Sequence, residues 1–415
     1  MGDESKVAGN GLLSRRHLVR LGGAAAGAIV VPTQAAPLAS EPWRSGSGAP
    51  PSAYGRRSRF AELERERVGG HPFGPAAGSA STPLQALNGV ITPNGLHFER
   101  HHSGIPDIDP GRHRLTIAGQ VRVPLAFDLN ALLRYPMQSR ILFLECSGNS
   151  YLNTTGDAQD LTAGTLSGLV SCAEWTGVPL SRLLEETGVG PNARWIVAEG
   201  ADPSGNKRSL PIDLALDGAM IALYQNGEPI RPSQGFPMRL FVPGCEGNLS
   251  VKWLRTLEVT DQPAQSREET SKYTDLMDDG RARQFSLRMD VKSLITSPSG
   301  RMHLPEHGIY EISGLAWSGH GAIRAVEVSA DGGSTWAEAD LQSEAEPLRP
   351  VRFRIPWRWN GAPARLQSRA VDTAGNVQPT RAAALAGRAP TAFYHYNGIQ
   401  TWAVDNSGRV RNVHA

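Results

Sequence analysis

The chain has 415 residues, of which 40% are apolar and 20% are charged, with 45 glycines and 30 prolines. This composition excludes a disordered or fibrous protein and predicts a loop-rich globular chain, and the length favours two domains over one. The formal net charge of +2 is carried by residues 1–39 and leaves the remainder nearly neutral, which disfavours a nucleic-acid-binding protein because such proteins need a basic excess.

The first part of the chain has the pattern of an export signal. Arg15 and Arg16 stand just before an eleven-residue stretch of apolar residues and glycine at 21–31, and small residues that suit cleavage follow. We interpret residues 1–39 as a twin-arginine signal peptide. The stretch is too short to cross about 30 Å of hydrocarbon, which disfavours a membrane anchor. Because this pathway exports folded proteins, the signal predicts a periplasmic protein that receives its cofactor before export.

Changes in composition and in secondary-structure pattern divide the rest of the chain into segments. Residues 40–94 are rich in Gly, Pro, Ser and Arg and predict an extended arm. Strand and helix patterns alternate without a regular period over residues 95–283, which predicts an α+β domain. Residues 284–390 carry strand-like segments between turns, typical of a β-sandwich, and residues 391–415 form a C-terminal tail. Arginines alternate with apolar residues at 351–359, so we expect an arginine face in solvent there.

Local patterns in the α+β domain place a thiol at the end of a strand. Residues 180–187 have helical spacing and end at Gly188, a favoured C-cap. Residues 141–145 predict a buried strand that stops at Cys146, and a Gly-Asn pair two residues later permits a sharp turn. A thiolate there can serve as a nucleophile or a metal ligand, although a lone cysteine is often only a small buried apolar residue. We expect that bland role for Cys172 and Cys245.

Four sequence blocks form one signature. The first, at 98–106, is a proline-terminated loop with an arginine and two histidines, and the second, at 143–149, contains Cys146. The other two, at 234–239 and 250–253, each contain one cationic side chain. In this order and spacing they resemble the sulfite oxidase family of molybdenum enzymes, from about Leu96 to Val404. The resemblance implies an α+β fold, in which a sulfite oxidase-type molybdopterin-binding domain is followed by an immunoglobulin-like β-sandwich that mediates dimerisation.

The resemblance also implies roles for single residues. Cys146 matches the thiolate that binds molybdenum beside the dithiolene sulfurs of molybdopterin, and soft sulfur ligands suit a redox-active metal. Arg100 and Tyr273 match residues beside the metal, so these three are the candidate catalytic residues. Cations and amides would hold the pterin phosphate. The matched cofactor-binding residues are Phe98, Arg100, His102, Cys146, Asp202, Gln234, Arg239, Ser250, Val251 and Lys252. The role of His101 stays open.

The chain departs from the sulfite-oxidising members of the family at the substrate pocket. Ser150 and Tyr151 stand where those members have an arginine, and a late arginine is replaced around His395. Losing two cations should weaken the binding of a free dianion by several kcal/mol, because charge-assisted hydrogen bonds contribute about 1.5 to 3 kcal/mol each. We therefore expect a bulkier substrate, with Tyr151 and His395 lining a wider channel.

The C-terminal segment 394–415 resembles the sulfane dehydrogenase branch of the family. This resemblance implies that a cysteine persulfide on a sulfur carrier protein is oxidised, with water as the oxygen source and a dihaem c-type cytochrome subunit as the electron acceptor. It also implies a homodimer through the sandwich, within a heterotetramer. The chain has no Cys-x-x-Cys-His motif, so we expect no haem in it, and neither nucleic acid nor a membrane as partner. The alternatives are a sulfite dehydrogenase acting on free sulfite and a non-catalytic secreted binding protein.

The export signal can be tested by changing both arginines. We expect Arg15→Lys together with Arg16→Lys to leave the precursor in the cytoplasm, because the translocase reads that pair. Fractionation of cells followed by immunoblotting measures the effect. Periplasmic protein at the wild-type level in the double variant would contradict the prediction.

Overall fold

The computed structural model describes residues 7–13, 43, 46–69, 74 and 76–414. The predicted twin-arginine motif therefore lies outside the described residues. In the part of the chain that the structure describes, no helix is long and apolar enough to cross a membrane.

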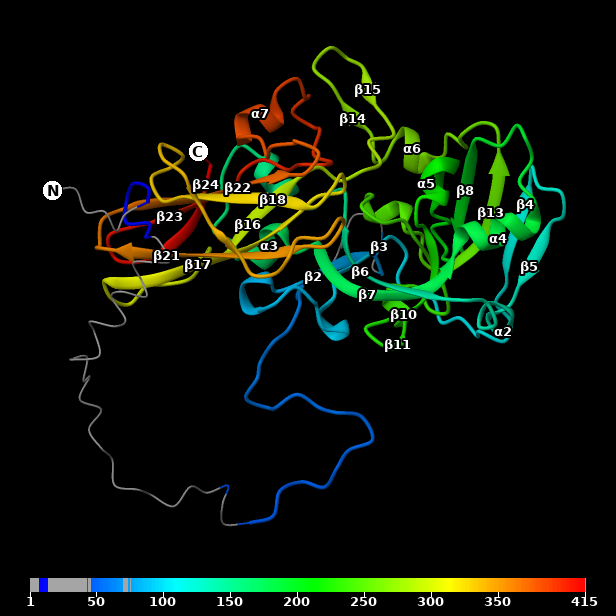
Figure 1. Cartoon of the computed structure of the whole chain (residues 1–415), viewed down its shortest axis with the longest axis horizontal. Coiled ribbons are helices and arrows are strands. Elements are labelled where there is room, and N and C mark those ends of the chain that lie inside the picture. Colours follow the sequence, from blue (N-terminus) through cyan, green and yellow to red (C-terminus); the bar gives the residue numbers. More distant parts are fainter. Residues whose placement is uncertain (1–6, 14–42, 44–45, 70–73, 75, 415) are drawn as a thin grey trace.

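Two domains lie end to end in an elongated molecule (Figure 1). The first domain holds strands β1–β15, and the sandwich holds strands β16–β24. Residues 46–65 of the predicted arm, coloured blue, loop out from the domains in Figure 1, and the chain returns at β1, which pairs with β2 (Gly78–Ser81). The rest of the predicted arm belongs to the fold, since Ala80 and Leu84 are buried. Residues 7–13 lie against the sandwich, where Leu12 is buried and forms a bridge with Trp357.

Two five-stranded sheets build the first domain. One has the order β11-β10-β7-β6, with β12 also paired to β10, and its strands are β6 (Gln138–Glu145), β7 (Val170–Pro179), β10 (Met220–Gln225), β11 (Glu228–Pro229) and β12 (Arg239–Phe241). The other has the order β5-β4-β13-β8-β9, and its strands are β4 (Leu115–Gly119), β5 (Leu125–Phe127), β8 (Trp195–Gly200), β9 (Lys207–Pro211) and β13 (Leu254–Thr260). A three-stranded sheet and a hairpin complete it, with β1 (Glu66–Gly69), β2, β3 (Glu99–His101), β14 (Asp275–Leu276) and β15 (Ala282–Arg283). Only the β13–β4 pair is parallel among these sheets.

The helices of the described residues are short, with at most eight residues each. The α-helices are α2 (Leu129–Leu132), α3 (Ala163–Ser167), α4 (Leu180–Thr187), α5 (Ile212–Leu216), α6 (Arg267–Thr270) and α7 (Arg381–Leu385). Single 3-10 turns are η2 (Leu84–Ala86), η3 (Asn94–Leu96), η4 (Tyr151–Thr154), η5 (Pro232–Gln234) and η6 (Gly247–Leu249). The helix predicted at 180–187 is confirmed as α4, and Gly188 ends it in a left-handed conformation with φ of 70°.

The second domain is a sandwich of two antiparallel sheets. The first has the order β16-β17-β21-β20, with β16 (Lys292–Ser297), β17 (Gly308–Trp317), β20 (Asp340–Leu341) and β21 (Val351–Trp359). The second has the order β19-β18-β22-β23-β24, with β18 (Ile323–Ser329), β19 (Ala337–Glu338), β22 (Ala364–Asp372), β23 (Thr401–Val404) and β24 (Val410–Val413). The tail predicted at 391–415 thus supplies two strands to the sandwich.

One arginine of β21 is not where the alternating pattern puts it. The apolar residues of the strand are buried as predicted, but Arg352, expected in solvent, is buried as well. Its guanidinium donates hydrogen bonds to the carbonyls of Leu87 and Gly89, at 3.1 and 2.9 Å. The expectation of a solvated arginine face is therefore wrong at this position, because unpaired backbone carbonyls from the end of the arm bind the side chain.

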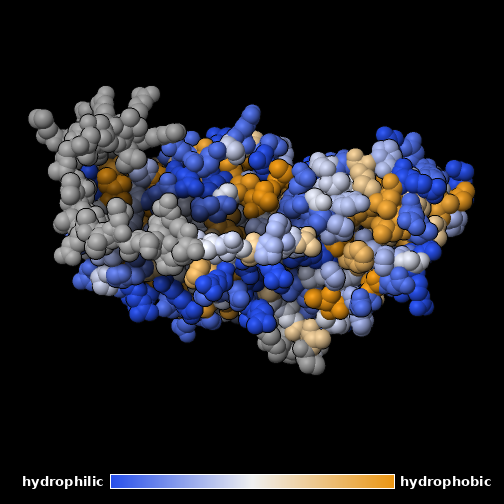
Figure 2. Space-filling model, turned by 90° about the horizontal axis from the view of Figure 1, so that it is seen from below, coloured by the Kyte–Doolittle hydropathy of each residue, from blue (hydrophilic) through white to orange (hydrophobic). Residues whose placement is uncertain are grey.

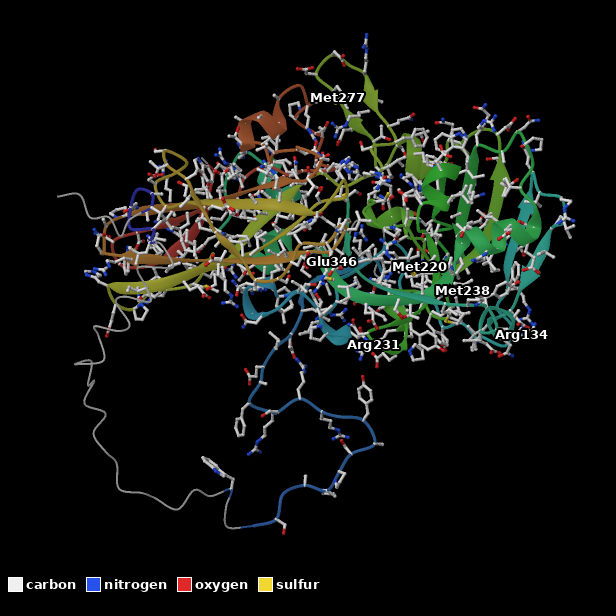
Figure 3. The ribbon with its side chains drawn as sticks, in the orientation of Figure 1. Arg134, Met220, Arg231, Met238, Met277 and Glu346 are labelled. Carbon is white, nitrogen blue, oxygen red and sulfur yellow. The ribbon has the colours of Figure 1, made fainter. Side chains whose placement is uncertain are left out.

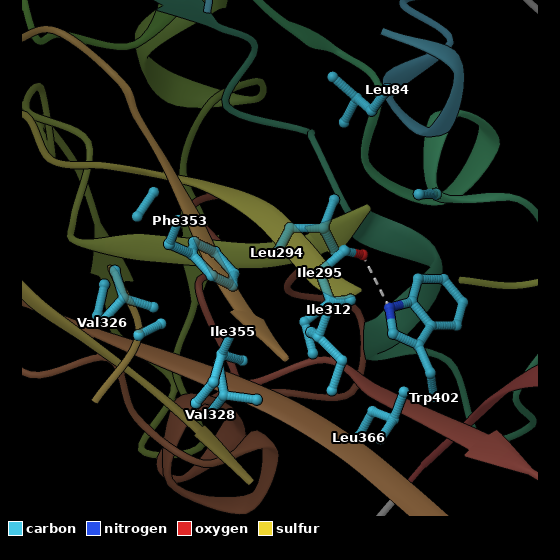
Figure 4. Packing of buried hydrophobic residues seen from close by; sticks show 14 of the residues in the cluster. Leu84, Leu294, Ile295, Ile312, Val326, Val328, Phe353, Ile355, Leu366 and Trp402 are labelled. Carbon is cyan, nitrogen blue, oxygen red and sulfur yellow. Dashed lines mark hydrogen bonds between the residues drawn. The ribbon is translucent and has the colours of Figure 1, made fainter. Parts of the chain in front are cut away.

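The sandwich core continues into the first domain. Leu294, Ile312 and Phe353 pack together, and Trp402 donates from Nε1 to the carbonyl of Ile295 at 3.0 Å (Figure 4). The same cluster includes Phe143 of β6. A second cluster fills the first domain, where the fully buried Met238 lies (Figure 3). On the face seen in Figure 2, apolar side chains form separate patches among hydrophilic ones. The two domains are therefore joined by shared apolar packing rather than by a loose linker.

The shared core gives a stability prediction. Phe353→Ala should lower the free energy of unfolding by about 3 to 5 kcal/mol, because a fully buried ring is replaced by a cavity. Ile309→Ala, on the exposed part of β17, is the control and should change it by no more than about 0.5 kcal/mol. Denaturant titration followed by tryptophan fluorescence measures both, and equal shifts would contradict the assigned core.

Candidate active site

A cavity of about 710 Å³, counted with its opening to solvent, lies beside the end of β6. All the site residues predicted from the sequence lie in its wall, namely Phe98, Arg100, His102, Cys146, Asp202, Gln234, Arg239, Ser250, Val251, Lys252 and Tyr273. They come from segments up to 175 positions apart, since Phe98 and Tyr273 are the outermost. The structure therefore brings the predicted set together, whereas the role of each residue stays a prediction.

Cys146 is held by the turn that follows β6. Its amide donates to the carbonyl of Leu169 at 2.9 Å, and its carbonyl accepts from the amide of Asn149 at 2.8 Å. The Asn149 side chain donates to Glu145 at 2.9 Å and accepts from the Leu169 amide at 3.0 Å. Burial raises the pKa of the Cys146 thiol. A metal that binds the sulfur must therefore displace a proton.

A buried guanidinium forms the floor of the cavity. Arg239 donates to the carbonyl and side-chain oxygens of Gln234, at 3.1 and 3.2 Å, and to the carbonyl of Ser250 at 2.8 Å. The Gln234 amide in turn donates to the carbonyl of Phe98 at 2.7 Å. Burial lowers the pKa of Arg239 to about 9. Among the described residues, no carboxylate forms an ion pair with Arg239, whose Cζ lies 5.2 Å from the ring centroid of Trp175, so carbonyl and amide dipoles and an aromatic face are what the protein sets against this charge.

A second cation lies beside it. The ammonium of Lys252 donates to the carbonyls of Arg100 and Ser233, at 3.1 and 3.2 Å, and lies 2.8 Å from Nδ1 of His101. Burial, and then the neighbouring Arg239, hold the pKa of Lys252 well below its usual range. His101, whose role the sequence left open, thus accepts from Lys252. An anion in this cavity would stabilise the charged form of the lysine.

Tyr273 and His102 form a stacked pair on another wall. The Tyr273 hydroxyl lies 3.3 Å from Nε2 of His102, with the ring planes 10° apart. Burial, and then Arg100, lower the pKa of His102 to about 4, so the imidazole is neutral near pH 7. Burial raises the pKa of Tyr273, so its hydroxyl keeps its proton. A protonated hydroxyl can donate one hydrogen bond into the cavity when Nε2 of His102 is its donor.

Polar atoms without partners test whether a polar cofactor fits. Nε of Arg239 and the side-chain oxygens of Asn206 and Asn248 are buried at the cavity and have no hydrogen-bond partner in the structure. Each such atom costs about 1 to 3 kcal/mol unless something binds it. Two cations, unpaired donors and acceptors, and one thiol suit an anionic, hydrogen-bonding cofactor that brings a soft metal. The residues present therefore fit molybdopterin and its molybdenum.

The comparisons with known proteins agree with this chemistry. An oxidoreductase molybdopterin-binding domain model matches residues 102–268, and a Mo-co oxidoreductase dimerisation domain model matches residues 283–401. The crystal structure of the sulfane dehydrogenase SoxCD from Paracoccus pantotrophus is similar, with 45% identity and a TM-score of 0.88, covering 91% of this chain and 97% of that chain. The chain belongs to the sulfite oxidase family of molybdenum enzymes. The predicted fold class is confirmed, as is the family resemblance.

Two curated relatives match over a smaller share of their own length. Mitochondrial sulfite oxidase from Mus musculus is 32% identical over 335 residues, which cover 74% of this chain and 61% of the relative. An NADH nitrate reductase from Brassica napus is 31% identical over 325 residues, which cover 70% of this chain and 35% of the relative. The chain thus spans about three fifths of the first relative and about a third of the second.

Two residues expected in a channel are not in the cavity wall. Tyr151 is 45% exposed and contacts the ring of Phe393 edge-on. His395 is buried, with Nε2 3.2 Å from a carboxylate oxygen of Glu246, and its amide donates to the carbonyl of Ser147. Conversely, sequence reasoning missed Asn206, Asn248 and Ser204 in the wall. Single polar residues in loops carry no periodicity, so only the folded chain reveals them.

The Tyr273 hydroxyl gives a prediction for this site. Tyr273→Phe should slow substrate oxidation by about ten- to a hundredfold and leave the molybdenum content unchanged, because only one hydroxyl is removed from the cavity wall that Cys146 shares. Stopped-flow reduction and metal analysis measure the two effects. An unchanged rate would show that Tyr273 has no part in turnover.

Proposed function

We propose that the protein is a periplasmic sulfane dehydrogenase, which oxidises sulfur bound as a persulfide to a cysteine of a carrier protein. The observation that carries the proposal is the 45% identity to the sulfane dehydrogenase SoxCD over 97% of that chain, combined with a cavity that fits molybdopterin. The twin-arginine pattern supports the location.

The charges around the cavity support a substrate that is not a free dianion. At the position after the cysteine turn, Ser150 is neutral, and the neighbouring charge of Lys292 is paired with Glu145. His395, near which the sulfite-oxidising members have a second arginine, is paired with Glu246. Arg100 remains in the cavity wall as a cation that can attract one anionic sulfur atom. A persulfide on a carrier needs fewer charges, because the carrier brings its own binding surface.

The proposed reaction balances with water as the oxygen donor. In the first step a persulfide anion and one water give a singly oxygenated outer sulfur, two protons and two electrons, and each later step adds one further oxygen from water with the same release of protons and electrons. When bound, the molybdenum cofactor supplies two-electron redox chemistry and oxygen transfer. Arg100 orients the anionic sulfur, and Tyr273 donates a hydrogen bond from a hydroxyl that stays protonated. Neutral His102 fixes that hydroxyl.

The electrons need an acceptor outside this chain. No Cys-x-x-Cys-His motif occurs in the sequence. We therefore propose a c-type, dihaem cytochrome subunit as the partner, with two copies of this chain paired through their sandwich domains within a heterotetramer. The match to a dimerisation domain at 283–401 supports this arrangement.

The ratio of two rates tests the substrate. Purified holoenzyme with its cytochrome should reduce that cytochrome slowly with sulfite and rapidly with a persulfidated carrier, because the cofactor would engage Arg239 and Lys252 and leave a free dianion only Arg100 among the cations of the wall. The same carrier without its persulfide is the control and should give no reduction. Sulfite turnover equal to or above the carrier-dependent rate would favour a sulfite dehydrogenase instead.

A further inference from the structure

Side chains of the sandwich reach the strand that carries the candidate metal ligand. Glu145 is the last residue of β6 and directly precedes Cys146. Its carboxylate is fully buried and accepts from Nζ of Lys292 at 3.0 Å and from Nε1 of Trp317 at 2.6 Å. These donors start β16 and end β17, and they face each other in the sheet register. The contact is therefore built by two paired strands of the sandwich.

Lys292 holds both ends of the cysteine turn. Besides Glu145, its ammonium donates to the hydroxyl of Ser150 at 2.8 Å and to the carbonyl of Tyr396 at 3.0 Å, which uses all three of its protons. Ser150 has a φ of 66°, in the left-handed region that a serine rarely adopts. Its hydroxyl also lies 2.8 Å from that of Ser167. Cys146 thus lies between two residues that one buried lysine ties together.

The free-energy cost of burying the Glu145–Lys292 ion pair indicates that the pair does more than stabilise the fold. Removing two charges from water is unfavourable, and a buried ion pair is often no more stabilising than apolar residues of similar size. Here each charged group is fully hydrogen-bonded, because Asn149 gives the carboxylate a third donor at 2.9 Å. A fully satisfied buried network fixes one geometry. The geometry that this network fixes is that of the turn around Cys146.

We propose that Lys292 is a positioning residue for Cys146, so that the sandwich domain completes the active site in addition to any role in dimerisation. Lys292 holds Glu145 and Ser150 at a fixed separation and thereby directs the sulfur into the cavity. The proposal does not depend on which sulfur compound the enzyme oxidises.

The test compares two variants that both weaken the sandwich. Lys292→Met removes the tether, which is the pair of hydrogen bonds from Lys292 to Glu145 and Ser150. Phe353→Ala damages the sandwich core and leaves these hydrogen bonds in place. In the full chain produced without cofactor, we expect Cys146 to be alkylated several-fold faster in Lys292→Met than in Phe353→Ala. Cys172 and Cys245 are buried and serve as internal references. In the holoenzyme, Lys292→Met should change the Mo(V) electron paramagnetic resonance spectrum and lower turnover by about ten- to a hundredfold.

Lys292→Met alone leaves the Glu145 carboxylate buried without its ion-pair partner and could fail to fold, so a second variant removes both charges. Lys292→Met with Glu145→Gln leaves no unpaired buried charge, and it still lacks the tether to Ser150. It should fold and still show the altered spectrum and faster alkylation. Lys207→Met, which removes a partly exposed ion pair with Glu199, is the control and should resemble wild type. A folded double variant with wild-type spectrum and alkylation rate would overturn the proposal.

Discussion

Positive charge held out of water is the constraint on which the site depends. Arg239 is buried and Lys252 is half-buried, and the field of the arginine makes it harder for the lysine to stay charged. Backbone carbonyls and the Gln234 amide oxygen are the acceptors that the protein supplies to the arginine. Dipoles compensate a buried charge only in part, so the cavity has a standing preference for an anion. The strands around it provide the rigid frame that keeps the two cations close.

The same frame explains why the domains cannot be understood separately. Phe143 of β6 belongs to the apolar cluster that fills the sandwich. Two residues later in the same strand, Glu145 accepts hydrogen bonds from Lys292 and Trp317 of the sandwich. Apolar packing and a buried polar network therefore both cross the interface between β6 and the sandwich, which we call the seam. Cys146 lies at the end of that seam, where a small shift of one domain against the other would move the sulfur.

Local patterns allowed the sequence to predict much of this arrangement. The helix α4 and its Gly188 cap depend on residues within two turns, and the strand before Cys146 depends on a short apolar stretch. The cavity residues were predicted through a family resemblance, which carries tertiary information that periodicity lacks. The failures were long-range. Arg352 is buried because carbonyls of Leu87 and Gly89, far away in sequence, bind it, and nothing within β21 indicates this.

The pairing of Glu145 with Lys292 also limits how this chain can change during evolution. The two residues belong to different domains, so a neutral substitution at one leaves the other as an unpaired charge in an apolar seam. Divergence of the two domains is therefore coupled at this point, and the paired positions should vary together or not at all. A chimera that joins the first domain of one family member to the sandwich of another inherits a working seam only when both parents carry compatible residues at these two positions.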